Sequence, residues 1–128
     1  MTRILAGLLS ALAVLAALAL APAAAQAASC SLSADDKYHR ANNKKPTYTR
    51  SLRVSGGATC ATGKKMISAY YRCRVAAPSP GKKGKCTKRV LGYSCSERRS
   101  NVIATQFDAT ATCKKGRARI VTTYTQFV

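Results

Sequence analysis

Large apolar side chains and acidic residues are both scarce in this chain of 128 residues. It contains no tryptophan and two phenylalanines, so the core that it can build is small and leaves little net stability. Four Asp and Glu stand against 22 Lys and Arg, which gives a formal net charge of +18. A positive charge of this size opposes compaction through self-repulsion and attracts anionic partners.

Residue types that carry most enzyme and metal chemistry are also missing or isolated. His39 is the one histidine, and the one carboxylate pair, Asp35 and Asp36, is adjacent in sequence, as in a solvated turn. The cysteines form no Cys-x-x-Cys pair for zinc, and Gly56-Gly57-Ala58-Thr59 is too short for a phosphate-binding loop. We therefore expect no catalytic residue, no metal and no cofactor. The enzymatic alternative is a small hydrolase, such as a ribonuclease that uses Glu97 with His39 and an arginine.

An N-terminal segment with almost no charge precedes the first cysteine. Arg3 is its single charge, and a long run of Leu, Ala, Val and Ile follows before several small residues. This pattern predicts a secretory signal peptide over residues 1–27, cleaved after Ala27 or after Ala25. The alternatives are a retained membrane anchor and lipidation of Cys30. With the signal removed, we expect a secreted, extracellular protein without a transmembrane segment.

All six cysteines lie downstream of this segment: Cys30, Cys60, Cys73, Cys86, Cys95 and Cys113. An even number of cysteines in a short exported chain predicts a disulfide framework. Of the 15 pairings that six cysteines allow, we expect Cys73–Cys86, because it closes a compact loop between a helix and the sheet. Cys60 then pairs with Cys113 or Cys95, and Cys30 takes the other. Three disulfides would offset the small core by about 2–4 kcal/mol each.

The mature chain is long enough for one domain. Removal of residues 1–27 leaves 101 residues (128 − 27) and a net charge of +17 (21 Lys and Arg minus four Asp and Glu). Residues 28–49 are polar and show neither helical nor strand periodicity, which predicts an irregular N-terminal arm, poorly ordered around residues 33–47. Residues 50–128 are predicted to form a single α+β domain, and we expect a monomer.

One helix and four strands are expected in that domain. Leu52 and Val54 alternate with polar residues, which predicts a strand that ends at Gly56-Gly57. A helix follows, with Thr59 as its cap, a core-facing stripe at spacings of three and four, and Pro78-Ser79-Pro80-Gly81 as its stop.

Three strand-like runs complete the domain, at residues 89–96, 103–113 and 118–127. Residues 97–101 are expected to join the first two, and a hairpin turn at residues 114–117 the last two. The sequence thus predicts an α+β fold in the order β-α-β-β-β, with the helix packed on a small antiparallel meander and disulfides as staples.

Four tyrosines could serve either packing or binding: Tyr70, Tyr71, Tyr93 and Tyr124. Their spacing favours core packing. The alternative is a platform on which the bases of single-stranded nucleic acid stack.

The same topology predicts that basic residues gather at one end of the molecule. In a meander, the loop that enters the first strand lies beside the turn that joins the next two. This reasoning predicts a positive pole, made of Lys82, Lys83, Lys85, Lys88, Lys114, Lys115 and Arg117. The alternative is that these residues occupy loops because loops are solvated.

Several short segments resemble those of uncharacterised small secreted proteins of high-GC bacteria. The segments are residues 59–60, 70–74, 90–95, 107–113 and 116–124, and the Gly-Tyr-x-Cys element that ends at Cys95 is the most specific. The resemblance implies a compact disulfide-containing module and carries over no activity, substrate or catalytic residue.

Two functions fit these features. The first is a secreted, non-catalytic module that binds anionic polymers, such as those of the cell wall or the membrane surface, with extracellular nucleic acid as a lesser candidate. The second is a secreted effector or enzyme inhibitor that acts through the loop at residues 78–88, which Cys73 and Cys86 would clamp.

Overall fold

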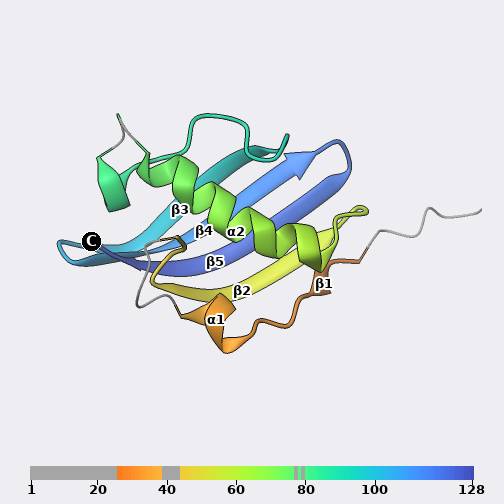
Figure 1. Cartoon of the computed structure of the whole chain (residues 1–128), viewed down its shortest axis with the longest axis horizontal. Coiled ribbons are helices and arrows are strands. Elements are labelled where there is room, and N and C mark those ends of the chain that lie inside the picture. The colour runs from red at the N-terminus through yellow and green to blue at the C-terminus, as the bar shows by residue number, and fades with distance from the viewer. Residues whose placement is uncertain (1–25, 39–43, 77, 79) are drawn as a thin grey trace, which may run out of the picture.

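The computed structural model describes residues 26–38, 44–76, 78 and 80–128, so nearly all of the predicted signal peptide lies outside the described residues. Five antiparallel strands form one sheet in the spatial order β1-β2-β5-β4-β3 (Figure 1). The strands are β1 (Ala28–Ser29), β2 (Tyr48–Ser55), β3 (Ser94–Ile103), β4 (Gln106–Lys115) and β5 (Ala118–Phe127). With three helical segments, α1 (Ala34–Lys37), α2 (Cys60–Val75) and the short 3₁₀ helix η1 (Gly81–Lys83), the predicted α+β class is confirmed.

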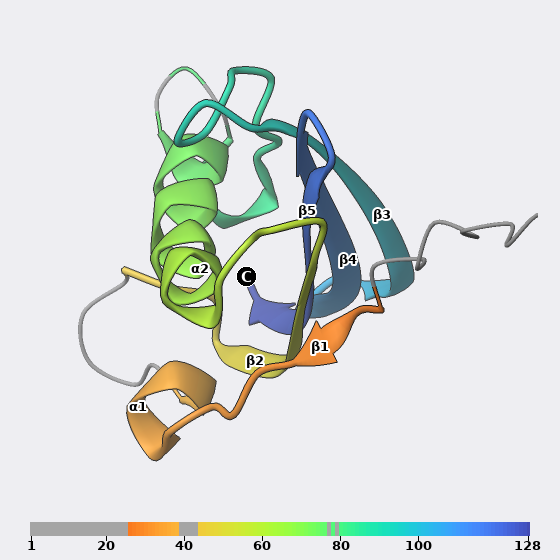
Figure 2. The ribbon, with the colours of Figure 1, turned by 90° about the vertical axis from the view of Figure 1, so that its right-hand side faces the viewer.

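Helix α2 lies across one face of the sheet (Figure 2). It begins where predicted, because the Thr59 hydroxyl accepts a hydrogen bond from the backbone N–H of Thr62, and it ends before Pro78. Gly63 lets the helix approach the sheet closely, since a Cβ at this position would lie 3.0 Å from a methyl group of Leu52. The helix therefore packs directly on β2.

The space between α2 and the sheet holds the core. Apolar residues of α2, β2, β4 and β5 fill it, among them Leu52, Met66, Ile67, Phe107 and Ile120. The four tyrosines considered above, Tyr70, Tyr71, Tyr93 and Tyr124, are all less than one tenth exposed. Their role as core residues is confirmed, and the alternative of a stacking platform made from them is wrong.

The first strand after the helix differs from its predicted bounds. Residues 90–93 form a tight turn in which Leu91 and Gly92 both have positive φ, and β3 starts only at Ser94. The predicted joint at residues 97–101 lies within β3 instead, and the turn to β4 is at Ala104-Thr105. The polar composition of 97–101 hid its alternation, in which every second side chain points into the interior. The predicted hairpin turn at 114–117 is confirmed, with Gly116 at a φ of 56°.

Three disulfides join the six cysteines, and one of them was predicted. Cys73–Cys86 is confirmed, whereas the other two pairs are Cys30–Cys60 and Cys95–Cys113. The predicted links from Cys60 to the sheet are wrong because the turn position was wrong. A β3–β4 joint centred on residue 99 would place Cys95 opposite residue 103, but the turn at 104–105 places it opposite Cys113.

The N-terminal arm contains a short helix that was not predicted. Ser33 and Asp36 cap α1 reciprocally, each side chain bonding the backbone N–H of the other. Asp36 also pairs with Lys64 of α2 at 3.0 Å and with Lys45 at 3.5 Å. Burial raises the pKa of Asp36, but the hydrogen bonds from Lys64 and Ser33 outweigh it and bring the pKa to about 2. The part of the arm that was expected to be poorly ordered is thus helical at Ala34–Lys37, while residues 39–43 lie outside the described residues.

Candidate functional site

The second face of the sheet is open. Within the described part of the chain, α2 covers one face and no helix lies on the other (Figure 2). Because side chains alternate along a strand, the pairing register determines which residues share this open face. One row across the sheet is Arg98–Thr110–Thr123–Ser51, and the next is Ser96–Thr112–Val121–Arg53.

Cations dominate the charge of the open face. It carries Arg50, Arg53, Arg98, Lys114 and Arg119, and all five are exposed. Its carboxylate is Asp108, which pairs with Arg50 at 3.0 Å. The hydrogen bonds from Asn101 and Thr125, together with the Arg50 charge, lower the pKa of Asp108 against the effect of burial. For the residues that the structure describes, the net charge of this face is therefore +4 (five cations minus one carboxylate).

Two of these cations face each other directly. Lys114 of β4 and Arg119 of β5 are register partners on adjacent strands. Like charges in this position repel and destabilise a sheet. Within the described residues neither makes an ion pair with a carboxylate. An anion above this pair would relieve the repulsion.

Hydroxyl groups fill the space between the cations. Thr110, Thr112 and Thr123 line the centre of the face, and Ser51 shares a hydrogen bond of 2.6 Å with Thr123. Short polar side chains of this kind keep the surface low, so that an extended polymer can approach the longer arginines. The face thus combines hydrogen-bonding groups with positive charge.

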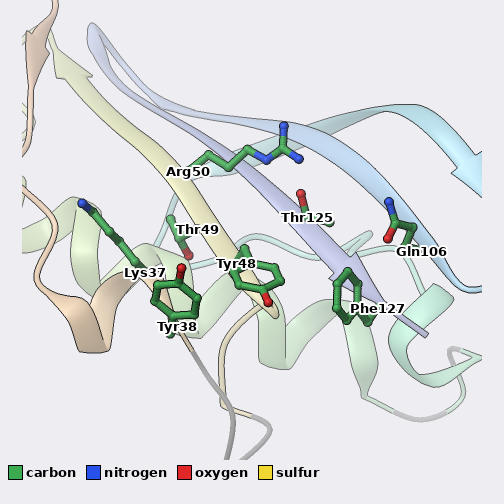
Figure 3. Close-up of a pocket in the computed structure, with 8 residues that line it drawn as sticks. All are labelled: Lys37, Tyr38, Tyr48, Thr49, Arg50, Gln106, Thr125 and Phe127. Carbon is green, nitrogen blue, oxygen red and sulfur yellow. The ribbon is translucent and has the colours of Figure 1, made fainter.

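An aromatic cleft lies at one end of this face (Figure 3). It has a volume of about 500 Å³ and includes an edge-to-face row of three rings. Tyr38 and Tyr48 have ring centroids 5.0 Å apart, and Tyr48 and Phe127 are 5.4 Å apart. Lys37 and Arg50 contribute the cations of the lining.

The predicted positive pole is not a single cluster. The Lys82 carbonyl accepts a hydrogen bond from Arg74, and the Lys83 carbonyl accepts one from Arg99 at 2.8 Å. These bonds hold Lys82 and Lys83 toward the β3–β4 turn, because Arg74 also bonds to Gln126, which lies opposite Phe107 near that turn. The β4–β5 turn is at the other end of both strands (Figure 1).

The other residues of the expected pole lie elsewhere. Lys114, Lys115 and Arg117 belong to the β4–β5 end, whereas Lys85 and Lys88 line a second cleft beside the Cys73–Cys86 disulfide. The expectation failed because the segment between η1 and β3 runs along the sheet instead of staying at one end (Figure 1). The C-terminal end of α2 accordingly lies at the same end of the sheet as the β3–β4 turn (Figure 1).

Glu97, the carboxylate considered for acid–base catalysis, is part of the interior. Its side chain is 4 % exposed and accepts hydrogen bonds from the hydroxyls of Tyr70 and Tyr124 and from Arg99. Burial and the Glu97 charge raise the pKa of both tyrosines. Its expected partner His39 lies outside the described residues.

Arg74 completes this interior cluster from α2. The side chain is fully buried, its Nε lies 3.9 Å from Glu97, and its guanidinium donates a hydrogen bond of 2.6 Å to Gln126. The same guanidinium carbon lies 5.2 to 5.5 Å from the ring centroids of Tyr71, Phe107 and Tyr124. This cluster holds helix and sheet together, and its charges are committed to one another.

Sequence reasoning missed the arginines of the open face. Arg53, Arg98 and Arg119 each occupy an outward position of a strand between inward-facing neighbours. Each of these arginines alternates with residues of inward-facing type, which was a usable signal, but the prediction was based on the lysines of the loops. Reading the register of the three long strands together would have placed them on one face.

Comparisons with protein-family models, with curated proteins and with solved structures give no match for this chain. Among the described residues, no helix combines the length and the apolar character that crossing a bilayer requires.

Proposed function

We propose that this protein is a secreted, non-catalytic module that binds anionic polymers through the open face of its sheet. The three disulfides are compatible with an oxidising extracellular compartment. The N-terminal pattern of the sequence agrees with export. The candidate partners are cell-wall or membrane-surface polymers and extracellular nucleic acid.

The distribution of charge on the open face carries this proposal. Five cations share it with one carboxylate, and the Lys114–Arg119 pair stands without a counter-charge from the described residues. Two cations that face each other on neighbouring strands do not stabilise the fold. Binding of a polyanion that neutralises both would explain their position.

The spacing of the cations favours an extended ligand over a small ion. Arg98 and Ser94 are four residues apart on β3, which corresponds to roughly 13 Å along a strand. Lys114 is the register partner of Ser94, and Arg119 is the register partner of Lys114. The cations of the face therefore span that distance. A chain of phosphates or carboxylates can contact all of them, whereas one small anion cannot.

Two quadruple variants of equal charge test this proposal. The first variant replaces Arg53, Arg98, Lys114 and Arg119 by Gln. Its matched control replaces four exposed cations outside the open face by Gln: Lys65, Arg72, Lys82 and Lys83. Binding of inorganic polyphosphate and of anionic phospholipid vesicles is measured over a range of salt concentrations. We expect the open-face variant to lose at least about tenfold in affinity with a much shallower salt dependence, and the control to lose about threefold or less. Equal losses in both variants would contradict the proposal, because net charge alone would then explain binding.

The second candidate function is inhibition of another protein through residues 78–88. Cys73–Cys86 closes this loop, and Arg99 donates hydrogen bonds of 2.8 and 2.6 Å to the carbonyls of Lys83 and Gly84. Such anchoring preorganises a loop for insertion into a partner. If the control variant above lost binding and the open-face variant did not, this second function would gain support.

A further inference from the structure

We infer that the aromatic cleft binds one nucleotide unit, so that the anionic polymer recognised by this protein is single-stranded nucleic acid. The inference rests on the proposed function, since the cleft lies at one end of the open face and shares Arg50 with it. It selects one polymer from the general class of polyanions.

The first argument is the exposure of the rings. Tyr38 is 54 % exposed and Phe127 is 41 % exposed, although most aromatic side chains of this small protein are buried. Tyr38, Tyr48 and Phe127 form a row along one side of the cleft (Figure 3). Exposed aromatic rings next to a cationic surface are the arrangement on which unpaired bases stack.

The second argument is an amide beside the rings. Gln106 lines the cleft and lies opposite Phe127 on the adjacent strand (Figure 3). A side-chain amide offers both a donor and an acceptor. Gln106 can therefore bond to the edge of a base that stacks on the neighbouring rings.

The third argument is the position of the cations around the rings. Lys37 lies at one end of the row and Arg50 above it, with its guanidinium directed along the open face (Figure 3). Arg50 pairs with Asp108 at 3.0 Å, but its side chain stays 58 % exposed. A guanidinium has five N–H donors, so Arg50 can keep this pair and still bind a phosphate. A phosphate chain that leaves the cleft would thus run onto the open face.

Single-stranded nucleic acid fits this combination better than other polyanions do. Polyphosphate and teichoic acid backbones have no ring for the aromatic row, and bases in a duplex are stacked on one another. A glycan would require several polar partners for its hydroxyls, whereas the cleft offers the Gln106 amide beside rings and cations. One amide is enough to bond to the edge of a single base.

The experiment compares three probes on the oxidised, exported protein. They are a fluorescein-labelled oligothymidylate, an abasic oligonucleotide of the same length and inorganic polyphosphate of equal phosphate count. We expect the oligothymidylate to bind about fivefold or more tightly than the abasic strand, because one base gains a stacking site. Hyaluronan, titrated in parallel, represents anionic glycans and should bind no more tightly than polyphosphate.

Three variants localise the preference. Tyr38→Ala and Phe127→Ala change exposed rings and should lower oligothymidylate affinity by about fivefold or more, while polyphosphate affinity changes less than about twofold. Gln106→Ala removes the amide beside the rings, so it should weaken oligothymidylate binding more than polyphosphate binding. Matching circular dichroism spectra control for folding.

The possible outcomes separate the two proposals. Equal affinity for the oligothymidylate and the abasic strand, or a preference for hyaluronan, would overturn this inference and leave the proposed function standing. Failure to bind any of the probes, polyphosphate included, would overturn the proposed function itself.

Discussion

The two faces of the sheet differ in how their charged side chains are paired and buried. On the face that α2 covers, Glu97 is surrounded by Arg99, Arg74 and two tyrosine hydroxyls. On the open face, one residue further along β3, Arg98 is exposed and has no carboxylate partner within the described residues. Alternation along a strand separates these two environments by a single residue.

This difference separates charges that the fold requires from charges that are available for binding. A buried charge must be paired, because an unpaired one is prohibitively costly, so the Glu97 cluster is explained by folding alone. An exposed cation needs no partner, and its position is free to serve binding. The gathering of such cations on one face, against the repulsion between Lys114 and Arg119, is the observation that supports the proposed anionic ligand.

Substitution of the neighbours Glu97 and Arg98 should break this comparison most strongly. Glu97→Ala leaves the Arg74 guanidinium buried without its carboxylate, so we expect the free energy of unfolding to fall by about 3–5 kcal/mol. Arg98→Ala removes an exposed side chain and should change it by no more than about 0.5 kcal/mol. Equilibrium unfolding of both variants in guanidinium chloride, with the disulfides intact, measures the two changes in the free energy of unfolding. Similar values for the two would mean that the faces are not energetically distinct.

Substitution of Asp108 should have a smaller effect, in the direction of tighter binding. Asp108→Asn removes the carboxylate of the open face and releases Arg50, so the salt dependence of polyphosphate binding should steepen by about one phosphate contact. Weaker binding in this variant would show that Asp108 supports the ligand instead of competing with it.

The same group gives a pH dependence with a definite sign. The pKa of Asp108 is lowered from 3.8 in the folded protein, so its contribution to stability is complete above that value and is lost as the pH falls through the lowered pKa. Over the same interval polyphosphate binding should strengthen, because Arg50 loses its competitor. Asp108→Asn should abolish this change in binding.

The sequence allowed the class and most of the elements to be predicted. The apolar stripe and the Thr59 cap defined α2, and the β-rich run with its Gly116 turn defined β5. These signals are local, because each depends on neighbours within a few residues. Cys73–Cys86 was also accessible, since a helix end and the following loop are close in sequence.

Properties that depend on the pairing register of the strands could not be predicted from local sequence signals. A shift of the β3–β4 turn from residues 97–101 to 104–105 changed two disulfides and both faces of β3 together. Glu97 and Arg99 resembled loop residues because their partners, Tyr70, Arg74 and Tyr124, are distant in sequence. For the same reason the open face could not be assembled from single strands.

Side-chain NMR of the arginines tests the central claim most directly, because each Nε–H signal reports its own guanidinium. Isotope-labelled protein is titrated with polyphosphate at low salt. We predict that the Nε–H signals of Arg53, Arg98 and Arg119 shift together and saturate, while those of Arg72 on α2 and of the buried Arg74 stay in place. Shifts confined to Arg72, Arg117 and the amides of residues 82–88 would contradict the assignment of the open face as the binding surface.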